Sequence, residues 1–315
     1  MFTPEGAAIN DRYFLALGTA SQVPTRRRNH NGYLVRWGAE GFLFDPGEGT
    51  QRQMIFHGVS VSEVTKIFIT HFHGDHCLGL PGIVQRLSLD GIVHQVDVFY
   101  PASGQRYLDN LVDASIFHNQ ANLRFVPIHE EGIVFEDAHL IVEAMPLDHS
   151  VDCWGYRFRD RETVTVLPER LRNLGIRGPD IGRLKREGVL ATESGEVRLE
   201  DVSVRKRGRS FAFVMDTRVC ENARRLAEKV DMLICESTYL ASETVDARKN
   251  GHLTAGQAAD IAAGAGADLL VLTHFSQRYV HLAPFVEEAS ARHAKVVAVN
   301  DGDRVDLPKR KRTLD

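Results

Sequence analysis

The stretch Lys66-Ile67-Phe68-Ile69-Thr70-His71-Phe72-His73-Gly74-Asp75-His76 is the most informative part of this chain. Its apolar start predicts a strand that ends in a tight turn. His71 and His73 are two residues apart and project from one side of an extended backbone, while Asp75 and His76 come round the turn to face them. Imidazole and carboxylate without thiolate suit zinc or manganese in a hydrolytic site. A polar loop without a cation would leave several desolvated groups unpaired. We therefore predict a binuclear metal site.

Composition describes an ordinary globular protein. The 315 residues are 43% hydrophobic and 25% charged, which is enough for a full core. The net charge of −4 argues against a protein that coats nucleic acid by bulk charge, although basic residues cluster at 26–28, 183–186, 205–209 and 309–312.

The cellular compartment is predicted from the cysteines, the apolar runs and the first residues of the sequence. Its four cysteines lack C-x-x-C spacing, which argues against a disulfide framework and against a thiolate metal site. No apolar run approaches the roughly 18 residues of a membrane span. The first residues also lack the basic and then apolar pattern of a secretory signal. We expect a cytoplasmic protein that is not bound to a membrane.

Short apolar runs alternate with stretches of helical period, which predicts a layered α/β architecture. The expected strands lie near 13–17, 32–37, 41–45, 66–70, 96–100, 122–128, 139–147, 153–159, 210–215, 231–235, 268–273 and 295–300. The expected helices lie at 48–57, 80–89, 104–114, 219–229, 254–264 and 282–293, the fifth with Thr254 as its N-cap.

Three further residues of the same chemistry stand where predicted strands end. His149 follows the run 139–147, Asp216 follows 210–215 and His274 follows 268–273. Ligand sites of α/β sheets collect at the carboxyl ends of strands. Each residue alone could equally be an ordinary loop residue. Together with the first cluster they make a set of seven candidate ligands: His71, His73, Asp75, His76, His149, Asp216 and His274.

This set resembles the metallo-β-lactamase superfamily, and its surroundings resemble the ribonuclease Z family within it. Pro24-Thr25-Arg26-Arg27-Arg28-Asn29 is similar to the P-x-K-x-R-N loop of that family, with Arg26 in place of lysine. Phe44-Asp45-Pro46-Gly47-Glu48-Gly49-Thr50-Gln51 is similar to its D-C-G-E-G-T-Q segment. The segments around His149 and His274 match as well. The resemblance covers nearly the whole chain.

One stretch best distinguishes the ribonuclease Z family from the rest of the superfamily. It is Gly175-Ile176-Arg177-Gly178-Pro179-Asp180-Ile181-Gly182-Arg183-Leu184-Lys185. It lies between His149 and Asp216, and in ribonuclease Z this Gly/Pro stretch belongs to a flexible arm that grips the tRNA. The alternative is a surface insertion with turn residues. The resemblance implies a single four-layer αββα domain over 1–315, with an inserted tRNA-binding arm at 160–205 and a basic tail at 308–315.

The chain also departs from the family pattern. Glu236-Ser237-Thr238 stands where many relatives have H-E-A-T, so that Cys235 replaces the histidine. Met215 replaces the usual glycine before Asp216, and Leu253 replaces a serine after His252. No metal ligand is lost.

The resemblance implies the chemistry of the site. His71, His73 and His149 would hold one Zn²⁺, and Asp75, His76 and His274 would hold the other, with Asp216 bridging; Mn²⁺ is an alternative. A hydroxide held between two metals would attack the phosphorus. Asp75 would act as general base and His252 as general acid oriented by Glu236.

The implied substrate is precursor tRNA. Cleavage would leave a 3′-hydroxyl on the tRNA and a 5′-phosphate on the trailer. The candidate substrate contacts are Arg26, Arg27, Arg28, Asn29, Gly178, Pro179, Arg183, Lys185 and Arg278. The family is commonly a homodimer, so we expect one here.

Two other functions remain open at this stage. An arylsulfatase-like hydrolase or small-molecule phosphodiesterase would keep the seven ligands but would need neither the arm nor the loop at 26–29. A metal-stabilised binding protein without turnover would be expected to lack a ligand or the Glu236–His252 pair, and the sequence has both.

Overall fold

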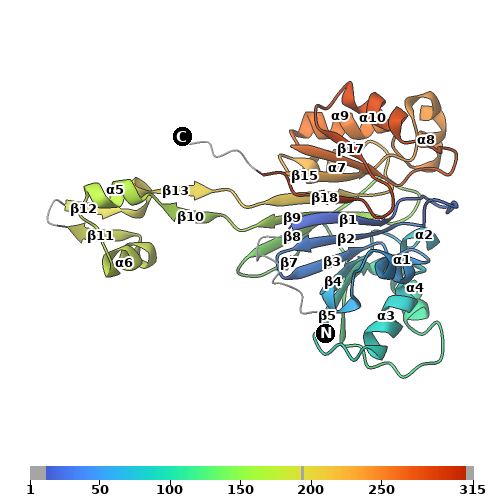
Figure 1. The fold of residues 1–315 in the computed structure, drawn as a ribbon, viewed down its shortest axis with the longest axis horizontal. Coiled ribbons are helices and arrows are strands. Elements are labelled where there is room, and N and C mark those ends of the chain that lie inside the picture. The colour runs from blue at the N-terminus through green and yellow to red at the C-terminus, as the bar shows by residue number, and fades with distance from the viewer. Residues whose placement is uncertain (1–11, 193–194, 310–315) are drawn as a thin grey trace. The chain divides into compact units, whose positions relative to one another are not determined.

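Two seven-stranded sheets form the body of the molecule (Figure 1). The computed structural model describes residues 12–192 and 195–309. The first sheet has the order β18 (Arg304–Asp306), β1 (Arg12–Gly18), β2 (Gly32–Trp37), β3 (Glu40–Phe44), β4 (Lys66–Phe68), β5 (Val96–Pro101) and β6 (Leu123–Ile128). The second has the order β17 (Val296–Ala298), β16 (Leu269–Thr273), β15 (Met232–Glu236), β14 (Ser210–Val214), β9 (Trp154–Asp160), β8 (Leu140–Pro146) and β7 (Gly132–Glu136).

Aromatic side chains fill the space between the sheets. Phe44 of the first sheet stacks on Phe213 of the second at 4.3 Å between ring centroids, and Phe42 stacks on Phe158 at 5.1 Å. Alternate residues of a strand face opposite sides, so Leu43 packs in the other direction, with the helices. Both faces of these strands are therefore buried, which is why their sequences are almost continuously apolar.

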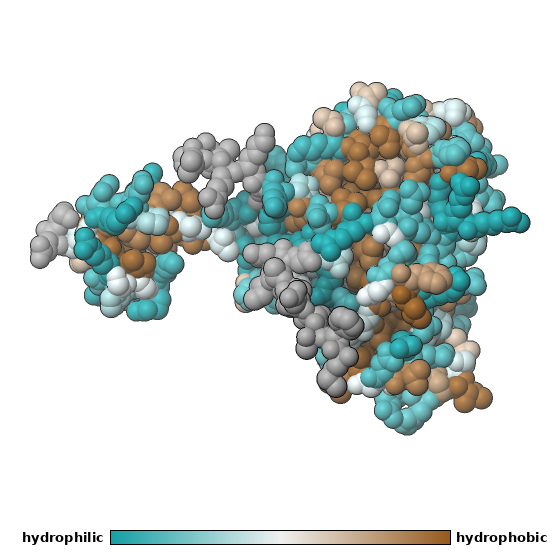
Figure 2. Space-filling model, in the orientation of Figure 1, coloured by the Kyte–Doolittle hydropathy of each residue, from teal (hydrophilic) through white to brown (hydrophobic). Residues whose placement is uncertain are grey.

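Helices cover the outer face of each sheet. The first sheet is covered by α1 (Thr50–Phe56), α3 (Leu80–Leu89) and α4 (Gln105–Val112). The second is covered by α7 (Glu221–Ala227), α9 (Ala255–Ala265) and α10 (Ala283–Ser290). The result is the four-layer αββα sandwich that the sequence predicted. The face shown in Figure 2 is largely polar, with apolar residues visible between the polar ones.

Parallel pairing brings several strand ends to one edge of each sheet. In the first sheet, β3, β4, β5 and β6 pair in parallel. In the second sheet, β14, β15, β16 and β17 do the same. Most of the residues that the sequence marked as candidate ligands or catalytic groups lie just after β4, β14 and β16 and at the end of β15.

Most expected elements are present with shifted ends, and several were not predicted. β4 stops at Phe68 instead of residue 70, and α10 stops at Ser290 instead of residue 293. Among the described residues of the body, the unpredicted strands are β7 and β18, and the unpredicted α-helices are the four-residue α2 (Gly74–Cys77) and α8 (Thr244–Asn250). All four are short, and their periodicity is correspondingly weak.

A second compact unit comprises residues 135–141 and 159–209. It contains β10 (Thr163–Val166) paired with β13 (Ser203–Lys206), and β11 (Val189–Thr192) paired with β12 (Gly195–Arg198). The helices α5 (Pro168–Asn173) and α6 (Pro179–Glu187) lie between them in the chain. This unit has its own small core of Leu171, Ile176, Leu184, Leu190, Val197 and Val202. The segment predicted as an inserted arm, 160–205, falls within it, and none of its helices or strands was predicted.

In the part of the chain that the structure describes, the helices are all too short or too polar to cross a membrane. The predicted basic tail at 308–315 lies outside the described residues from position 310 onward.

Candidate metal centre

The seven candidate ligands meet at the shared edge of the two sheets. His71 and His73 lie on the extended segment after β4, and Asp75 and His76 lie in α2. His149 follows β8. His274 directly follows β16, and Asp216 lies two residues after the end of β14. The ligands therefore come from both sheets, as the strand-end pattern of the sequence predicted.

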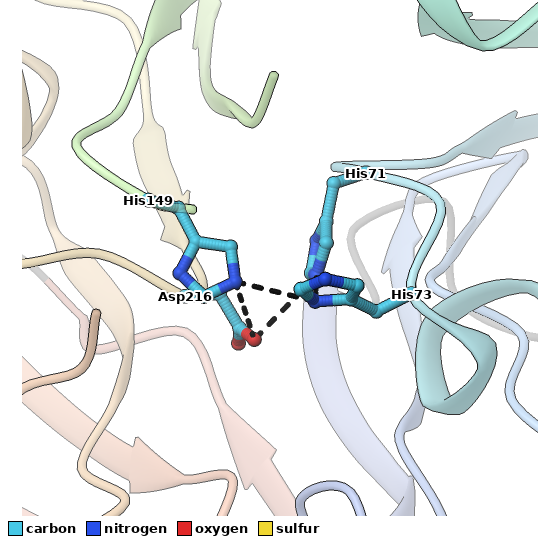
Figure 3. A group of neighbouring side chains, drawn as sticks. All are labelled: His71, His73, His149 and Asp216. Atoms are coloured by element: carbon cyan, nitrogen blue, oxygen red, sulfur yellow. Dashed lines mark hydrogen bonds and ion pairs between the residues drawn. The ribbon is translucent and has the colours of Figure 1, made fainter. Parts of the chain in front are cut away.

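One group of four comprises His71, His73, His149 and Asp216, whose ligand atoms all lie within 4.8 Å of one another (Figure 3). Nε2 of His71 and Nδ1 of His73 are 3.0 Å apart, and Nε2 of His149 is 3.3 Å from the same Nδ1 atom. Oδ2 of Asp216 is 3.5 Å from Nε2 of His71 and 3.7 Å from Nε2 of His149.

A second group comprises Asp75, His76 and His274, also within 4.8 Å of one another. Nε2 of His76 is 3.3 Å from Oδ2 of Asp75, and Nε2 of His274 is 3.6 Å from the same oxygen. Asp216 joins the two groups, because its Oδ2 is 3.3 Å from Nε2 of His76 and its Oδ1 is 3.1 Å from Nε2 of His274.

Four of the imidazoles are held by a partner on the ring nitrogen that faces away from the centre. Nδ1 of His76 lies 2.9 Å from Oδ2 of Asp45, and Nδ1 of His149 lies 2.9 Å from the carbonyl of Gly251. Nδ1 of His71 and of His274 lie 3.0 and 2.7 Å from the hydroxyls of Thr70 and Thr238. Such partners fix the ring orientation of metal-binding histidines.

The backbone is strained at the same place. Among the described non-glycine residues, φ is positive at Asp45, Asp216, His274 and Lys229. The first three belong to the centre, with φ values of 42°, 40° and 62°. Such conformations cost free energy in residues with a side chain, and they persist where surrounding contacts impose them. The folded chain thus aims Asp216 and His274 inward against local preference.

The donor set fits divalent cations. Oδ1 of Asp216 and Nε2 of His274 are buried and form no hydrogen bond with any described residue. Burial lowers the pKa of His71, and it has the same effect on His73 and His149, which keeps these rings neutral as metal ligands require. Burial raises the pKa of Asp75, but His76 and His274 outweigh it and hold that carboxylate ionised. A cation between these groups would use both lone pairs that now face each other.

Glu236 and His252 form a pair beside this centre. Glu236 ends β15 and is fully buried. Its Oε1 accepts from the backbone N–H of Thr217 at 3.0 Å and lies 3.0 Å from Nδ1 of His252. Its Oε2 accepts from the N–H and hydroxyl of Thr238. Nδ1 of His252 is 4.0 Å from Oδ2 of Asp216. Burial opposes protonation of His252, but Glu236 and Asp216 prevail and raise its pKa to about 9.

The basic residues predicted to bind phosphate differ in availability. Arg26 is exposed. Arg28 is buried, and its guanidinium donates to the carbonyls of Tyr279 and Val280 at 2.8 and 3.4 Å. Arg278 pairs with Glu243 and Asp246 at 2.8 and 3.0 Å. The Arg28 side chain thus joins two loops of the protein. The sequence had predicted a phosphate contact for it and no structural role.

Asn29 belongs to the same loop arrangement. Its side-chain amide donates to the carbonyl of Glu48 at 2.7 Å, and its backbone N–H donates to Oδ2 of Asp301 at 2.6 Å. Oδ1 of Asp301 also accepts from the hydroxyl of Thr19 at 2.8 Å, and Oδ2 accepts from Nε2 of Gln53 at 2.9 Å. Asp301 therefore anchors the 24–29 loop.

The predicted contacts of the inserted segment lie on and before α6. Gly178 has φ 52° and ψ −124°, a conformation open to glycine, and Pro179 begins the helix. Arg183 pairs with Glu187 of the same helix at 3.2 Å, and Lys185 is exposed.

Sequence reasoning missed three residues that support the site. Asp45 ends the predicted strand 41–45, so the strand-end pattern could have found it. Thr238 follows Glu236 by two residues, and nothing in its type marks it. Asp301 contacts Asn29 across 272 residues of chain, and a single sequence carries no signal for such a pair.

The departures from the family pattern lie mainly in the core. Cys235 and Leu253 are fully buried among the apolar residues that join the second sheet to its helices. Ser237 is buried and donates its hydroxyl to the carbonyl of Thr273 at 3.2 Å. Met215 is also fully buried.

Comparison with known families agrees with this geometry. Residues 25–162 match the metallo-beta-lactamase superfamily, and residues 197–275 match the beta-lactamase superfamily domain. Ribonuclease Z of Nocardia farcinica is 53% identical over 305 residues, which cover 96% of this chain and 100% of the relative. Ribonuclease Z of Streptomyces avermitilis is 48% identical over 301 residues, which cover 95% of this chain and 99% of the relative.

Solved structures share the fold. The short form of human tRNase Z superposes with a TM-score of 0.68 at 24% identity, covering 94% of this chain and 100% of that one.

Proposed function

The chain belongs to the ribonuclease Z family of the metallo-β-lactamase superfamily, and on this basis we propose that it is a zinc-dependent endoribonuclease that removes the 3′ trailer of precursor tRNA. The observation that carries the proposal is the Glu236–His252 pair set against a centre of seven ligand side chains. The centre alone would serve many hydrolases. A positioned proton donor suits a substrate whose leaving group is a poorly acidic ribose 3′-oxygen.

Two divalent cations are part of the proposal. One would be held by His71, His73 and His149 and the other by Asp75, His76 and His274, with Asp216 shared between them. Zinc matches the histidine-rich donor set, and Mn²⁺ is the alternative. When bound, the cations would supply an activated water and neutralise charge that develops on the phosphate.

Asp75 has a second role in this proposal. Its Oδ2 faces His76 and His274, and Asn31 donates to the same oxygen at 3.4 Å. These contacts keep the carboxylate ionised, and its other oxygen is the proposed acceptor of the proton from the attacking water. Asp75 is thus proposed as both metal ligand and general base.

His252 is proposed as the general acid. Glu236 holds its Nδ1–H, so the protonated ring carries the second N–H on Nε2, and Nε2 forms no hydrogen bond with the described residues. Two further contacts to Thr217 and Thr238 prevent the Glu236 carboxylate from rotating away. A ring held in one orientation with one free N–H can deliver its proton to the leaving 3′-oxygen.

Binding of the tRNA body is proposed for the second unit, residues 135–141 and 159–209. Lys185 and Arg186 are exposed near the end of α6, and Arg183 is 58% exposed at its side chain. RNA duplexes are bound mainly through shape and backbone phosphates, so exposed cations on a small folded unit suit the tRNA body. We also propose a cytoplasmic homodimer in which this unit serves the neighbouring subunit.

One assay tests the function. Precursor tRNA carrying a 3′ trailer is incubated with the zinc-loaded enzyme, with and without a chelator, and both product ends are mapped. We expect chelator-sensitive cleavage that leaves a 3′-hydroxyl on the tRNA and a 5′-phosphate on the trailer. Hydrolysis of small phosphodiesters without cleavage of any precursor tRNA would favour a small-molecule phosphodiesterase instead. Light scattering of the same preparation gives the oligomeric state.

A further inference from the structure

A groove with an excess of positive charge begins at His252. One hollow of about 600 Å³ is lined by Arg218, Thr244, Val245, Arg248 and Lys249. A second hollow of about 320 Å³ shares Arg218, Thr244 and Arg248 with it and adds Asp148 and His252. Because they share these walls, the two hollows form one groove that reaches the proposed general acid. We call it the basic groove.

The end of α8 ties this groove to the metal centre. Gly251 is the C-cap of the helix and has φ 80°. Its carbonyl oxygen lies 2.9 Å from Nδ1 of His149. A Cβ atom at Gly251 would lie 2.7 Å from that nitrogen, so the backbone approaches the ligand as closely as it can. His252 follows immediately. Arg248 lines the same hollow as His252, and Lys249 follows Arg248 in the last turn of α8.

Arg218 links the two walls of the groove. Its Nε donates to the carbonyl of Arg248 at 2.8 Å, and its Nη1 is 3.1 Å from Oδ1 of Asp148. Its Nη2 has no hydrogen-bond partner among the described residues. Arg218 is therefore held in place with part of its guanidinium still available.

The other two cations of the groove are unpaired. The side chains of Arg248 and Lys249 are exposed, and neither forms an ion pair within the described part of the chain. Among the described residues that line the groove, there are thus three cations and one carboxylate, that of Asp148. A concave surface with such an excess attracts anions, and guanidinium and ammonium groups are suited to phosphate oxygens.

We propose that the basic groove binds the RNA backbone on the tRNA side of the cleaved bond. This inference rests on the proposed function. In an in-line displacement the leaving oxygen departs on the side opposite the attacking water, so the 3′-oxygen faces His252. The ribose that carries this oxygen belongs to the last nucleotide of the product tRNA. The strand therefore continues past His252, where Arg248 and Lys249 can contact the phosphate that precedes this nucleotide.

The experiment pairs protein variants with single neutral linkages in the substrate. Precursor tRNAs carry one methylphosphonate, placed either at the first linkage before the cut or at the first linkage after it. Each is cleaved by the wild type, Arg248→Gln, Lys249→Gln and the conservative Lys249→Arg. Lys295→Gln is the control, because Lys295 is a surface lysine paired with Asp268 outside the groove.

We expect Arg248→Gln and Lys249→Gln to raise KM for precursor tRNA about 10-fold, with little change in kcat, and to lower the salt dependence of kcat/KM by about one charge each. Lys249→Arg and Lys295→Gln should behave like the wild type. The methylphosphonate before the cut should impair the wild type by a similar factor and should add little to the loss in the glutamine variants. Bis(p-nitrophenyl) phosphate, which has no neighbouring phosphate, should be affected less than precursor tRNA.

Other outcomes overturn the inference. Full additivity at the linkage before the cut would mean that the groove does not contact that phosphate. Non-additivity at the linkage after the cut would assign the groove to the trailer instead. Equal losses on both substrates, repeated in Lys249→Arg, would mean a disturbed metal centre. If the wild type cleaves precursor tRNA and the variants are unchanged, only the groove assignment fails; if the wild type cleaves none, the proposed function fails with it.

Discussion

Nδ1 of His252 lies 3.0 Å from Oε1 of Glu236, and this contact joins the end of a strand to the residue that follows a helix and its C-cap. Glu236 ends a central strand and is fixed by backbone pairing, whereas His252 follows a short helix that ends at Gly251. The contact gives the ring both an orientation and a charge. It also places the ring beside Asp216, which the two ligand groups share.

His252→Ala should slow cleavage of precursor tRNA by about 10²–10⁴, the usual contribution of a positioned acid, with little change in tRNA affinity. A phosphodiester with a low-pKa leaving group needs no proton and should be much less affected. Single-turnover rates on both substrates measure the difference. Equal damage to both would indicate a structural role for this ring.

The pH profile gives a second measure of the same residue. Glu236 and Asp216 raise the pKa of His252 against the effect of burial, to about 9, and bound cations would oppose this rise. An acid must be protonated to act, so the rate on precursor tRNA should fall as pH rises through the pKa of His252, at or below about 9. This alkaline limb should be absent in His252→Ala and should move to lower pH in Glu236→Gln. An unchanged limb in both variants would contradict the assignment.

Asp75→Ala should be more damaging than the loss of a simple ligand, because it removes a metal contact and the proposed base together. His73→Ala provides the comparison, since Nδ1 of His73 contacts Nε2 of His71 and of His149 and, among the described residues, no carboxylate. Excess zinc should recover part of the activity of His73→Ala and leave the chemical step of Asp75→Ala slow. Full recovery of Asp75→Ala by zinc would exclude the base role and leave the ligand role intact.

Metal content should be close to two divalent ions per chain, bound without sulfur. Among the described residues, no cysteine belongs to a candidate metal group. Burial also raises the pKa of Cys77 to about 12 and that of Cys153 above its usual range, which disfavours both thiolates. Elemental analysis of the active protein, and of Cys153→Ala as a control, measures the stoichiometry. An active, folded preparation without metal would rule out the proposed mechanism.

The proximity of the candidate ligands at the strand ends could be predicted from sequence because each follows a strongly apolar run. His274 directly follows Leu269–Thr273, and Asp216 lies two residues after the end of β14. Apolar runs of this length that are rich in β-branched and aromatic residues favour buried strands. The family resemblance and the four-layer fold, predicted from these positions and their flanking motifs, are confirmed.

What escaped prediction depends on contacts between distant residues or on weak local signals. The guanidinium of Arg28 reaches Tyr279 across 251 residues, and its sequence neighbours mark it only as one of three arginines. The helices α5 and α6 are short and mostly polar outside Leu171 and Leu184, so their apolar period is faint. They fold because the small core of their own unit selects that conformation.

The inserted unit offers the test that separates binding from chemistry. Val166 of β10 is opposite Ser203 of β13, and Leu167 donates its N–H to the carbonyl of Val202. Replacing residues 167–202 by a two-residue Asn-Gly turn should therefore close the β10–β13 pair as a hairpin. The deletion removes Arg183, Lys185 and Arg186 together with the small core that supports them.

We expect this deletion to weaken tRNA binding and to reduce its salt dependence, because contacts to backbone phosphates are lost. Hydrolysis of a small phosphodiester needs only the metal centre and should persist. The full chain with Arg183, Lys185 and Arg186 all changed to Gln is the matched control, because it keeps the fold of the unit and removes only its charge. Both variants should lose affinity in a salt titration if the exposed cations are the contacts. Loss in the deletion alone would assign binding to the shape of the unit, whereas unchanged affinity in both would refute the arm assignment and favour a small-molecule phosphodiesterase.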